Sequence, residues 1–160
     1  IEIYKNARFC EEAKCLIIGE NFNKLITTKK VAIISGGSSD LAVSLEAKLV
    51  LEIYGVECKT FIDVGVAGIH RLLNEIEKIK KYDVLIVCAG MEGALPTVIG
   101  GLLPQPIIGV PISVGYGVSK DGLTALNSML SSCSPGISVM NIDNGYGAAM
   151  AALRIIKRIS

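Results

Sequence analysis

The feature that most constrains this chain is an apolar segment that ends in a glycine turn, within residues 83–96. Residues 84–88 are all apolar and do not alternate with polar residues, which is typical of a central parallel strand covered by helices on both faces. Gly90 and Gly93 end this strand and hold Glu92 between them. The segment therefore predicts a carboxylate at the carboxyl end of a core strand, which is where open α/β sheets bind ligands.

Strand-like and helix-like segments alternate on both sides of this turn. Apolar segments bounded by glycine and polar residues predict strands over 31–35, 56–62, 84–88, 106–111 and 137–142. Segments with helical spacing predict helices over 41–54, 70–81, 95–102, 123–131 and 146–159. This alternation predicts an α/β fold with a parallel five-stranded sheet, a flavodoxin-like three-layer α/β/α sandwich.

The first 30 residues lack this alternation. Residues 1–30 have weak periodicity and mixed charge, so we expect a lead-in segment or the end of an upstream linker, with a short strand at 15–18. Residues 31–160 have the length of a single domain with one core. The small residues of 145–152 predict close helix packing, which we expect to be against another subunit.

Composition excludes several classes of protein. Hydrophobic residues make up 51% of the chain and charged residues 19%, which predicts a surface hidden by oligomerisation. No apolar segment approaches the roughly 20 residues that span a bilayer, and no signal peptide is recognisable. The net charge is +1 and the Lys and Arg residues are scattered, so the sequence does not predict the basic surface patch that binds nucleic acid. Five irregularly spaced cysteines predict reduced thiols in a cytoplasmic protein.

The segment SGGSSD, residues 35–40, follows the first core strand and opens a helix. Its backbone N–H groups and hydroxyls are of the kind that binds phosphate at a helix N-terminus, with Gly36, Ser38 and Ser39 as candidate contacts. Asp40 is expected either to cap the helix or to hold a sugar hydroxyl. A simple capping turn explains the same residues without a ligand.

His70 is the only histidine, and it follows a glycine-containing loop that begins at Asp63. Because no second His or Cys lies at ligand spacing, no metal site is predicted. The neighbouring Arg71 is a candidate partner for a phosphate or a carboxylate. A structural hydrogen-bonding role for His70 is the alternative.

Cys133 lies in SSCSPG, between a helix end and the last strand, whereas Cys58 and Cys88 lie within apolar strands. A thiol among small polar residues is a candidate nucleophile that helix amides or a bound cation would activate as a thiolate. An unreactive surface cysteine is the ordinary alternative. We expect Cys133 at the same edge of the sheet as Glu92, and this placement favours the functional interpretation.

Two further loops are candidates for the same edge. The loop 113–122 is long enough to cover a site, with Lys120 and Asp121 as candidate ligands, although a bare connection is the alternative. In NIDNGYG, Asn141 or Asn144 is expected to reach substrate or, equally, to form a turn and a helix cap.

Taken together and in order, the loops SGGSSD, DVGVAGIHR, AGMEGALP, GVPISVGYG, SSCSPG and NIDNGYGA resemble the LarB family, the pyridinium carboxylases of nickel-pincer nucleotide biosynthesis. The resemblance is to the C-terminal, PurE-like domain of that family and runs from about residue 31 to the end. More distantly, the chain resembles PurE, the aminoimidazole ribonucleotide carboxylase or mutase of purine synthesis. PurE's SAHR is matched by GIHR with His70, but its second histidine, before LPG, is Ala94 here. PurE also lacks the loop cysteine and the glutamate of GMEGALP.

The LarB resemblance implies carboxylation at C5 of the pyridinium ring of nicotinic acid adenine dinucleotide, followed by hydrolysis of the phosphoanhydride to release AMP. It implies that the Cys133 thiolate adds at C4, that C5 then attacks CO₂, and that Glu92 removes the C5 proton. Residues 113–116 are expected to close over the ring. The residues expected to bind substrate are Gly36, Ser38, Ser39, Asp40, Asp63, His70, Arg71, Gly90, Met91, Gly93, Ser113, Tyr116 and Asn144.

The same resemblance sets the expected cofactors and partners. CO₂ is the co-substrate and no tightly bound cofactor is expected, while Mg²⁺ held through the substrate diphosphate is left open. A homo-oligomer is expected, with eight copies as in PurE-like domains. The alternatives are a PurE-type enzyme acting on aminoimidazole ribonucleotide and a non-catalytic nucleotide-binding module, which Glu92 and Cys133 argue against.

Overall fold

The computed structural model of the chain describes residues 4, 6–19 and 22–160. Five parallel strands form one sheet in the order β4-β3-β5-β6-β7. This is the strand order of the flavodoxin-like fold, so the predicted fold class is confirmed. The strands are β3 (Lys30–Ser35), β4 (Glu57–Phe61), β5 (Val84–Ala89), β6 (Ile107–Pro111) and β7 (Ile137–Val139).

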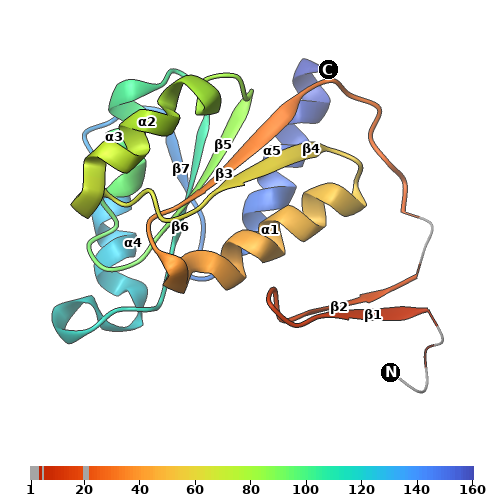
Figure 1. The fold of residues 1–160 in the computed structure, drawn as a ribbon, viewed down its shortest axis with the longest axis horizontal. Helices are drawn as coiled ribbons and strands as arrows, with labels where there is room; N and C mark the ends of the chain where they lie inside the picture. The colour runs from red at the N-terminus through yellow and green to blue at the C-terminus, as the bar shows by residue number, and fades with distance from the viewer. Residues whose placement is uncertain (1–3, 5, 20–21) are drawn as a thin grey trace.

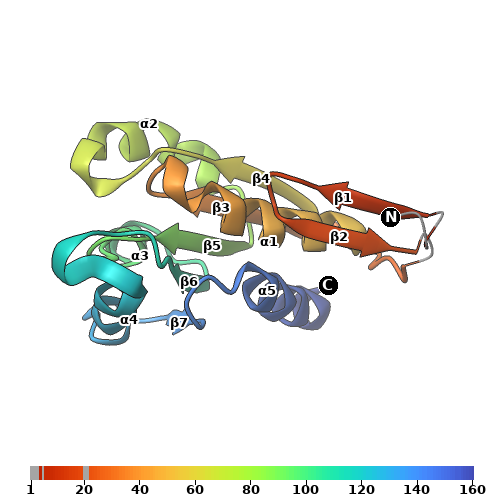
Figure 2. The same cartoon turned by 90° about the horizontal axis from the view of Figure 1, so that it is seen from below.

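Helices cover both faces of the sheet (Figures 1 and 2). They are α1 (Leu41–Ile53), α2 (Ile69–Ile79), α3 (Leu95–Leu102), α4 (Leu123–Leu130) and α5 (Gly145–Ile159). One face packs on α1 and α5 and the other on α2, α3 and α4. Short 3₁₀ turns, Ser38–Asp40, Val66–Gly68 and Gly117–Gly122, lead into α1, α2 and α4.

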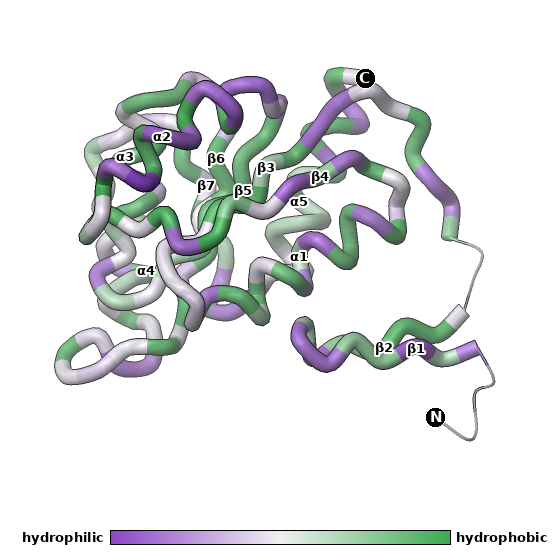
Figure 3. The backbone as a smooth tube through the Cα atoms, in the orientation of Figure 1, coloured by the Kyte–Doolittle hydropathy of each residue, from purple (hydrophilic) through white to green (hydrophobic). Residues whose placement is uncertain are grey.

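The central strand β5 has every residue buried, as its continuous apolar sequence predicts. Val84, Ile86 and Cys88 pack in the core shared with α1 and α5. The alternate residues Leu85, Val87 and Ala89 pack in the core shared with α2, α3 and α4. Figure 3 shows the resulting hydrophobic centre as green strands surrounded by more polar helices. The strand therefore fixes where its terminal turn lies.

Two features of the last strand and helix differ from expectation. The strand ends at Val139 instead of residue 142, because the Asn141 side chain accepts the backbone N–H of Ile142 at 2.9 Å and turns the chain out of the sheet. Helix α5 begins at Gly145, one residue before the predicted start, and its small residues Gly145, Ala148, Ala149 and Ala152 are buried within the chain. The packing of this helix on another subunit stays a prediction. A side chain at Gly145 would meet the carbonyl oxygen of Val43, in α1, at 2.4 Å.

The segment before the sheet forms an antiparallel hairpin of β1 (Ala7–Cys10) and β2 (Cys15–Ile18). The strand expected at 15–18 is confirmed, and its partner β1 was not expected. The hairpin stands beside α1, away from the sheet (Figures 1 and 2). In the described part of the chain, no helix is long and apolar enough to cross a membrane.

Candidate functional site

A pocket of about 200 Å³ lies where β3, β4 and β5 end, side by side, at the carboxyl edge of the sheet. Its walls come from the three segments that follow these strands and from the start of α3. The predicted site residues that line it are Gly36, Ser39, Asp40, Arg71, Gly90, Met91 and Glu92. The pocket is therefore where the sequence pattern placed a ligand, at the ends of the core strands.

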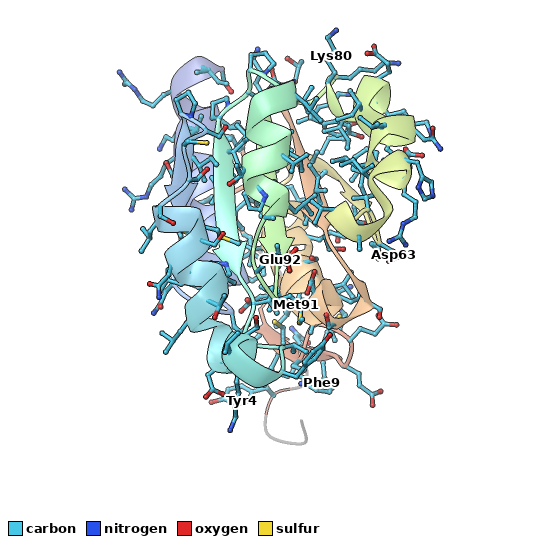
Figure 4. The ribbon with its side chains drawn as sticks, turned by 90° about the vertical axis from the view of Figure 1, so that its left-hand side faces the viewer. Tyr4, Phe9, Asp63, Lys80, Met91 and Glu92 are labelled. Atoms are coloured by element: carbon cyan, nitrogen blue, oxygen red, sulfur yellow. The ribbon has the colours of Figure 1, made fainter. Side chains whose placement is uncertain are left out.

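Glu92 is held at the pocket by a tight turn. The N–H of Gly93 donates to the carbonyl oxygen of Gly90 at 2.9 Å, which closes the turn around Met91 and Glu92. Met91 has φ 53° and Gly93 has φ 63°. Glycine normally occupies the first central position of such a turn, so Met91 stores backbone strain of a kind that gathers at functional sites. Glu92 is exposed at the pocket mouth, below α3 in Figure 4.

The pocket walls approach one another backbone to backbone. A Cβ at Gly65 would lie 2.5 Å from the carbonyl oxygen of Gly36, and one at Gly90 would lie 2.6 Å from that of Val114. Any side chain at either glycine would force the loops apart. The second contact also places the start of the loop after β6 against the Glu92 turn.

Asp40 forms part of the pocket floor and is 2% exposed. Its carboxylate accepts the N–H of Gly37 at 2.9 Å and the hydroxyl of Ser39 at 3.0 Å. Burial raises the pKa of Asp40 above its ordinary value, and these hydrogen bonds only partly oppose the shift. The Asp40 side chain therefore stabilises the loop 36–40, but it forms no capping hydrogen bond with the first turn of α1. A cationic or hydrogen-bond-donating ligand would stabilise this carboxylate.

Arg71 is the pocket's one cation among the lining residues. Its guanidinium is paired with the Asp63 carboxylate, and Asp63 has φ 60°. The guanidinium lies over Gly68, where an added Cβ would meet Nε at 2.6 Å. Because both side chains are substantially exposed, the pair contributes little to stability and serves mainly to position Arg71.

Other predicted residues lie outside the pocket lining. His70 is exposed in the first turn of α2, and Ser38 is exposed between two loop residues that do line the pocket. Gly93 is buried against α4, where a Cβ would lie 2.8 Å from Ala125 Cα. Asn144 is the cap that the ordinary interpretation predicted, because its side-chain oxygen accepts the N–H of Gly147 at 2.7 Å.

The loop after β6 does not close over the pocket in a single chain. The N–H of Ser113 donates to the Asp143 carboxylate at 2.8 Å, which ties the loop to the end of β7. Tyr116 is 78% exposed and does not line this pocket. The expected covering role of residues 113–116 stays a prediction.

Cys133 is exposed in the loop between α4 and β7. This loop precedes a strand that runs parallel to β6, whereas the Glu92 turn follows β5. The expectation that both lie at one edge of the sheet is wrong within one chain, because loops before and after parallel strands fall at opposite edges. The loop that holds Cys133 contacts α3, because the hydroxyl of Ser132 in this loop lies 2.7 Å from the hydroxyl of Thr97 in α3.

Several lining residues were not predicted. They are Gly37, Gly65, Val66, Ala67, Ala89, Ala94 and Leu95. Most contribute backbone or small apolar surface, and none of them has a reactive side chain that would mark it in the sequence. Gly65 could have been found, since a glycine directly after a strand in DVGVAG indicates close backbone approach.

Comparisons with known proteins agree on one family. The sequence model described as AIR carboxylase matches residues 30–159. The N5-carboxyaminoimidazole ribonucleotide mutase of Methanocaldococcus jannaschii is 40% identical over 131 residues, covering 79% of this chain and 78% of that enzyme. Uncharacterized protein MJ0165 of the same organism is 50% identical over 149 residues, covering 92% of this chain. This chain spans only 57% of the length of MJ0165.

Solved structures agree on the fold. The crystal structure of Treponema denticola PurE2-S38D has a TM-score of 0.65 at 24% identity, covering 82% of each chain. At this level of identity the likeness concerns the fold alone.

Proposed function

The chain belongs to the AIR carboxylase family, and from this we propose that it transfers a carboxyl group to a nucleotide bound at the carboxyl edge of its sheet. The observation that carries the proposal is the turn of residues 90–93, which holds the Glu92 carboxylate at the mouth of the pocket at that edge. The backbone of Met91 is strained, and such strain gathers at functional sites, where it helps to position a side chain such as that of Glu92.

Two substrates compete within this proposal. The relatives support aminoimidazole ribonucleotide more directly, because N5-carboxyaminoimidazole ribonucleotide mutases match 79% of this chain. In a mutase reaction the carboxyl group would leave N5 of the carboxylated nucleotide and bond to a carbon of the same aminoimidazole ring, whereas in a carboxylase reaction it would come from CO₂. In both cases the ring carbon then loses one proton to a base. The nucleotide phosphate would lie on the loop 36–40 and against Arg71.

The pocket residues favour the second substrate, the pyridinium ring of nicotinic acid adenine dinucleotide. In the described residues the lining includes no histidine, and Ala94 stands where the PurE pattern has one. The lining carries two carboxyl groups, Asp40 and Glu92, and its one cation is already paired. This balance suits a positively charged ring better than a neutral aminoimidazole, since burial of Asp40 is relieved by a nearby cation.

The pyridinium reaction would proceed through a covalent intermediate. A thiolate adds to C4 of the ring, the electron pair moves to C5, and C5 forms a bond to CO₂. Glu92 then accepts the C5 proton, the ring electrons expel the thiolate, and aromaticity returns. The net change replaces one hydrogen by a carboxylate and releases one proton. The described residues include no group of three His, Cys, Asp or Glu that could hold a metal ion, so no step is assigned to one.

Cys133 would supply the thiolate from a neighbouring copy in a homo-oligomer. Within one chain its loop lies before β7 and Cys133 does not line the pocket, so in this proposal a second chain presents the thiol. An octamer would provide such neighbours. The later hydrolysis of the phosphoanhydride, with release of AMP, belongs to the same proposal and has no assigned residue.

The test offers both nucleotides to the same protein preparation with ¹³C-bicarbonate. A carboxylated pyridinium product by mass spectrometry would support the LarB-type assignment, and one from aminoimidazole ribonucleotide alone would support the PurE-type assignment. Because a mutase takes its carboxyl group from the nucleotide itself, N5-carboxyaminoimidazole ribonucleotide is offered as a third substrate. No ring-carboxylated product from any of the three nucleotides would contradict carboxyl transfer at this site. The matched control is the Glu92→Gln variant, which should give no label with either nucleotide.

A further inference from the structure

The hairpin of β1 and β2 has two different faces. Its register places Ala7, Phe9, Leu16 and Ile18 on one face and Arg8 and Ile17 on the other. Arg8 and Ile17 line a cavity shared with α1, so that face looks toward the domain. The opposite face is apolar and open, with Phe9, Leu16 and Ile18 each about half exposed. We call the hairpin of β1 and β2 the arm, and these three residues the arm face.

The arm is distinct from the common family fold. The AIR carboxylase match begins at residue 30, after the hairpin. The match to MJ0165 covers 92% of this chain and is therefore too long to omit the whole of residues 1–29. An isolated two-stranded hairpin is marginally stable in water. Because Phe9, Leu16 and Ile18 are exposed on this hairpin, we expect another surface to cover them.

A second open surface lies close to the arm. A groove of about 840 Å³ runs between the segment 23–25, the end of α1 and the outer side of α5. Its floor is apolar, made by Leu25, Tyr54, Met150 and Leu153. Arm and groove are neighbours, because Lys24 lines both this groove and the cavity beneath the hairpin.

The rim of the groove is strongly basic. Lys24, Arg154, Lys157 and Arg158 line it, with no Asp or Glu among the lining residues that the structure describes. The described ion pairs use none of these four cations. Arg154 and Arg158 are also spaced one helical turn apart, where like charges destabilise a helix. This arrangement fits an acidic partner.

The arm carries the matching charge. Its turn contains Glu11 and Glu12, both exposed and both outside the described ion pairs, and one cation, the exposed Lys14, so its net charge is negative. An apolar ridge with acidic residues at its tip therefore stands beside an apolar groove with a basic rim. When two complementary patches lie next to each other on one chain, a two-fold axis lets each copy place its arm in the other's groove and closes the assembly.

We propose that the hairpin arm of one copy docks into the α5 groove of a second copy, with Phe9, Leu16 and Ile18 on the groove floor and Glu11 and Glu12 against its basic rim. The interface uses no residue of the carboxyl-edge pocket. It is therefore independent of which nucleotide the pocket binds.

Photo-crosslinking tests the contact directly. Phe9 is replaced by photoreactive p-benzoylphenylalanine, and ¹⁴N- and ¹⁵N-labelled copies are mixed before irradiation. We expect cross-links from position 9 to residues 150–158 that join a light and a heavy chain. Cross-links confined to single chains, or none to that segment, would overturn the proposal.

Charge exchange tests the electrostatic part. Glu11→Lys with Glu12→Lys, and separately Arg154→Glu with Lys157→Glu, should each weaken subunit association by about tenfold or more in sedimentation analysis. Mixing the two variants should restore association toward wild type. Lys80→Glu, at the far end of α2 (Figure 4), is the control and should have no effect. Unchanged association in both variants, or no restoration on mixing, contradicts the docking.

Discussion

The turn of residues 90–93 and the loop of residues 131–136 look alike in sequence but differ in structure. Both contain small residues around one reactive side chain, Glu92 or Cys133. The first is closed by a backbone hydrogen bond, follows a fully buried strand and lines a pocket. The second is exposed and lies before the short edge strand β7. A core strand fixes the residue that follows it, whereas the loop before a strand faces the other edge.

The same contrast separates what one chain provides from what an assembly must provide. Glu92, Asp40 and Arg71 meet in one pocket of a single chain. In the proposed pyridinium reaction, Cys133 joins them from another copy. Four experiments would sharpen or break this contrast, beginning with the largest expected effect.

Replacing Glu92 with Gln should reduce carboxyl transfer by about 10²- to 10⁴-fold, because the general base is lost while the side-chain shape is kept. The rate is followed by label from ¹³C-bicarbonate entering the nucleotide. Glu77→Gln, an exposed position on α2, is the matched control and should retain full activity. A Glu92→Gln enzyme with wild-type turnover would remove this turn from the reaction.

Cys133→Ser should abolish pyridinium carboxylation and leave aminoimidazole carboxylation unchanged, because only the first uses a thiolate. If the thiol comes from a neighbouring copy, reassembling inactive Cys133→Ser and Glu92→Gln chains in equal amounts should restore about a quarter of wild-type activity. Mixtures that stay inactive would mean that no site is shared between copies in this way. Wild-type pyridinium turnover by Cys133→Ser would refute the covalent step.

Met91→Gly should raise the free energy of unfolding by about 1 kcal/mol, because glycine adopts the positive φ of this turn without strain. Activity should fall, since the freed turn positions Glu92 less well. Lys14→Gly relieves a similar φ of 52° in the hairpin of β1 and β2, away from the pocket, and should raise stability without the loss of activity. Denaturant unfolding and turnover are measured on the same samples. Equal losses of activity in both variants would contradict a special role for the Met91 strain.

The smallest effect concerns the pH dependence of stability. Burial raises the folded-state pKa of Asp40 above its ordinary 3.8, so the folded protein binds the extra proton. Stability from this group is therefore present at low pH and is lost as pH rises through the raised pKa. Asp40→Asn should flatten that slope in denaturant unfolding as the pH rises above 3.8. An unchanged slope would show that Asp40 does not titrate differently in the fold.

Much of the fold could be predicted because local pattern and global architecture agree in this chain. The uninterrupted apolar β5 and the alternation of strands with helices determine the sheet, and the glycines after β5 locate Glu92. The strand β1 could not be predicted, because four residues with an arginine among them carry almost no periodicity. Its place depends on pairing with β2.

The sequence predicted the site residues that directly follow core strands. It did not predict the role of residues whose side chains are placed by contacts with distant parts of the chain. Gly36, Ser39, Asp40 and Arg71 line the pocket, whereas Ser38 does not. Asn144 could equally bind substrate or cap a helix by sequence, and only the contact with Gly147 decides for the cap. The edge predicted for Cys133 was wrong because the composition of a loop does not show whether the loop precedes or follows a strand, and this loop precedes β7.

The most direct test is a structure of the protein with its nucleotide bound. The account predicts the nucleotide's phosphate on residues 36–40 near Arg71 and its ring beside Glu92, at the carboxyl ends of β3 and β5. A nucleotide bound instead in the basic groove beside α5, with the carboxyl-edge pocket empty, would contradict it.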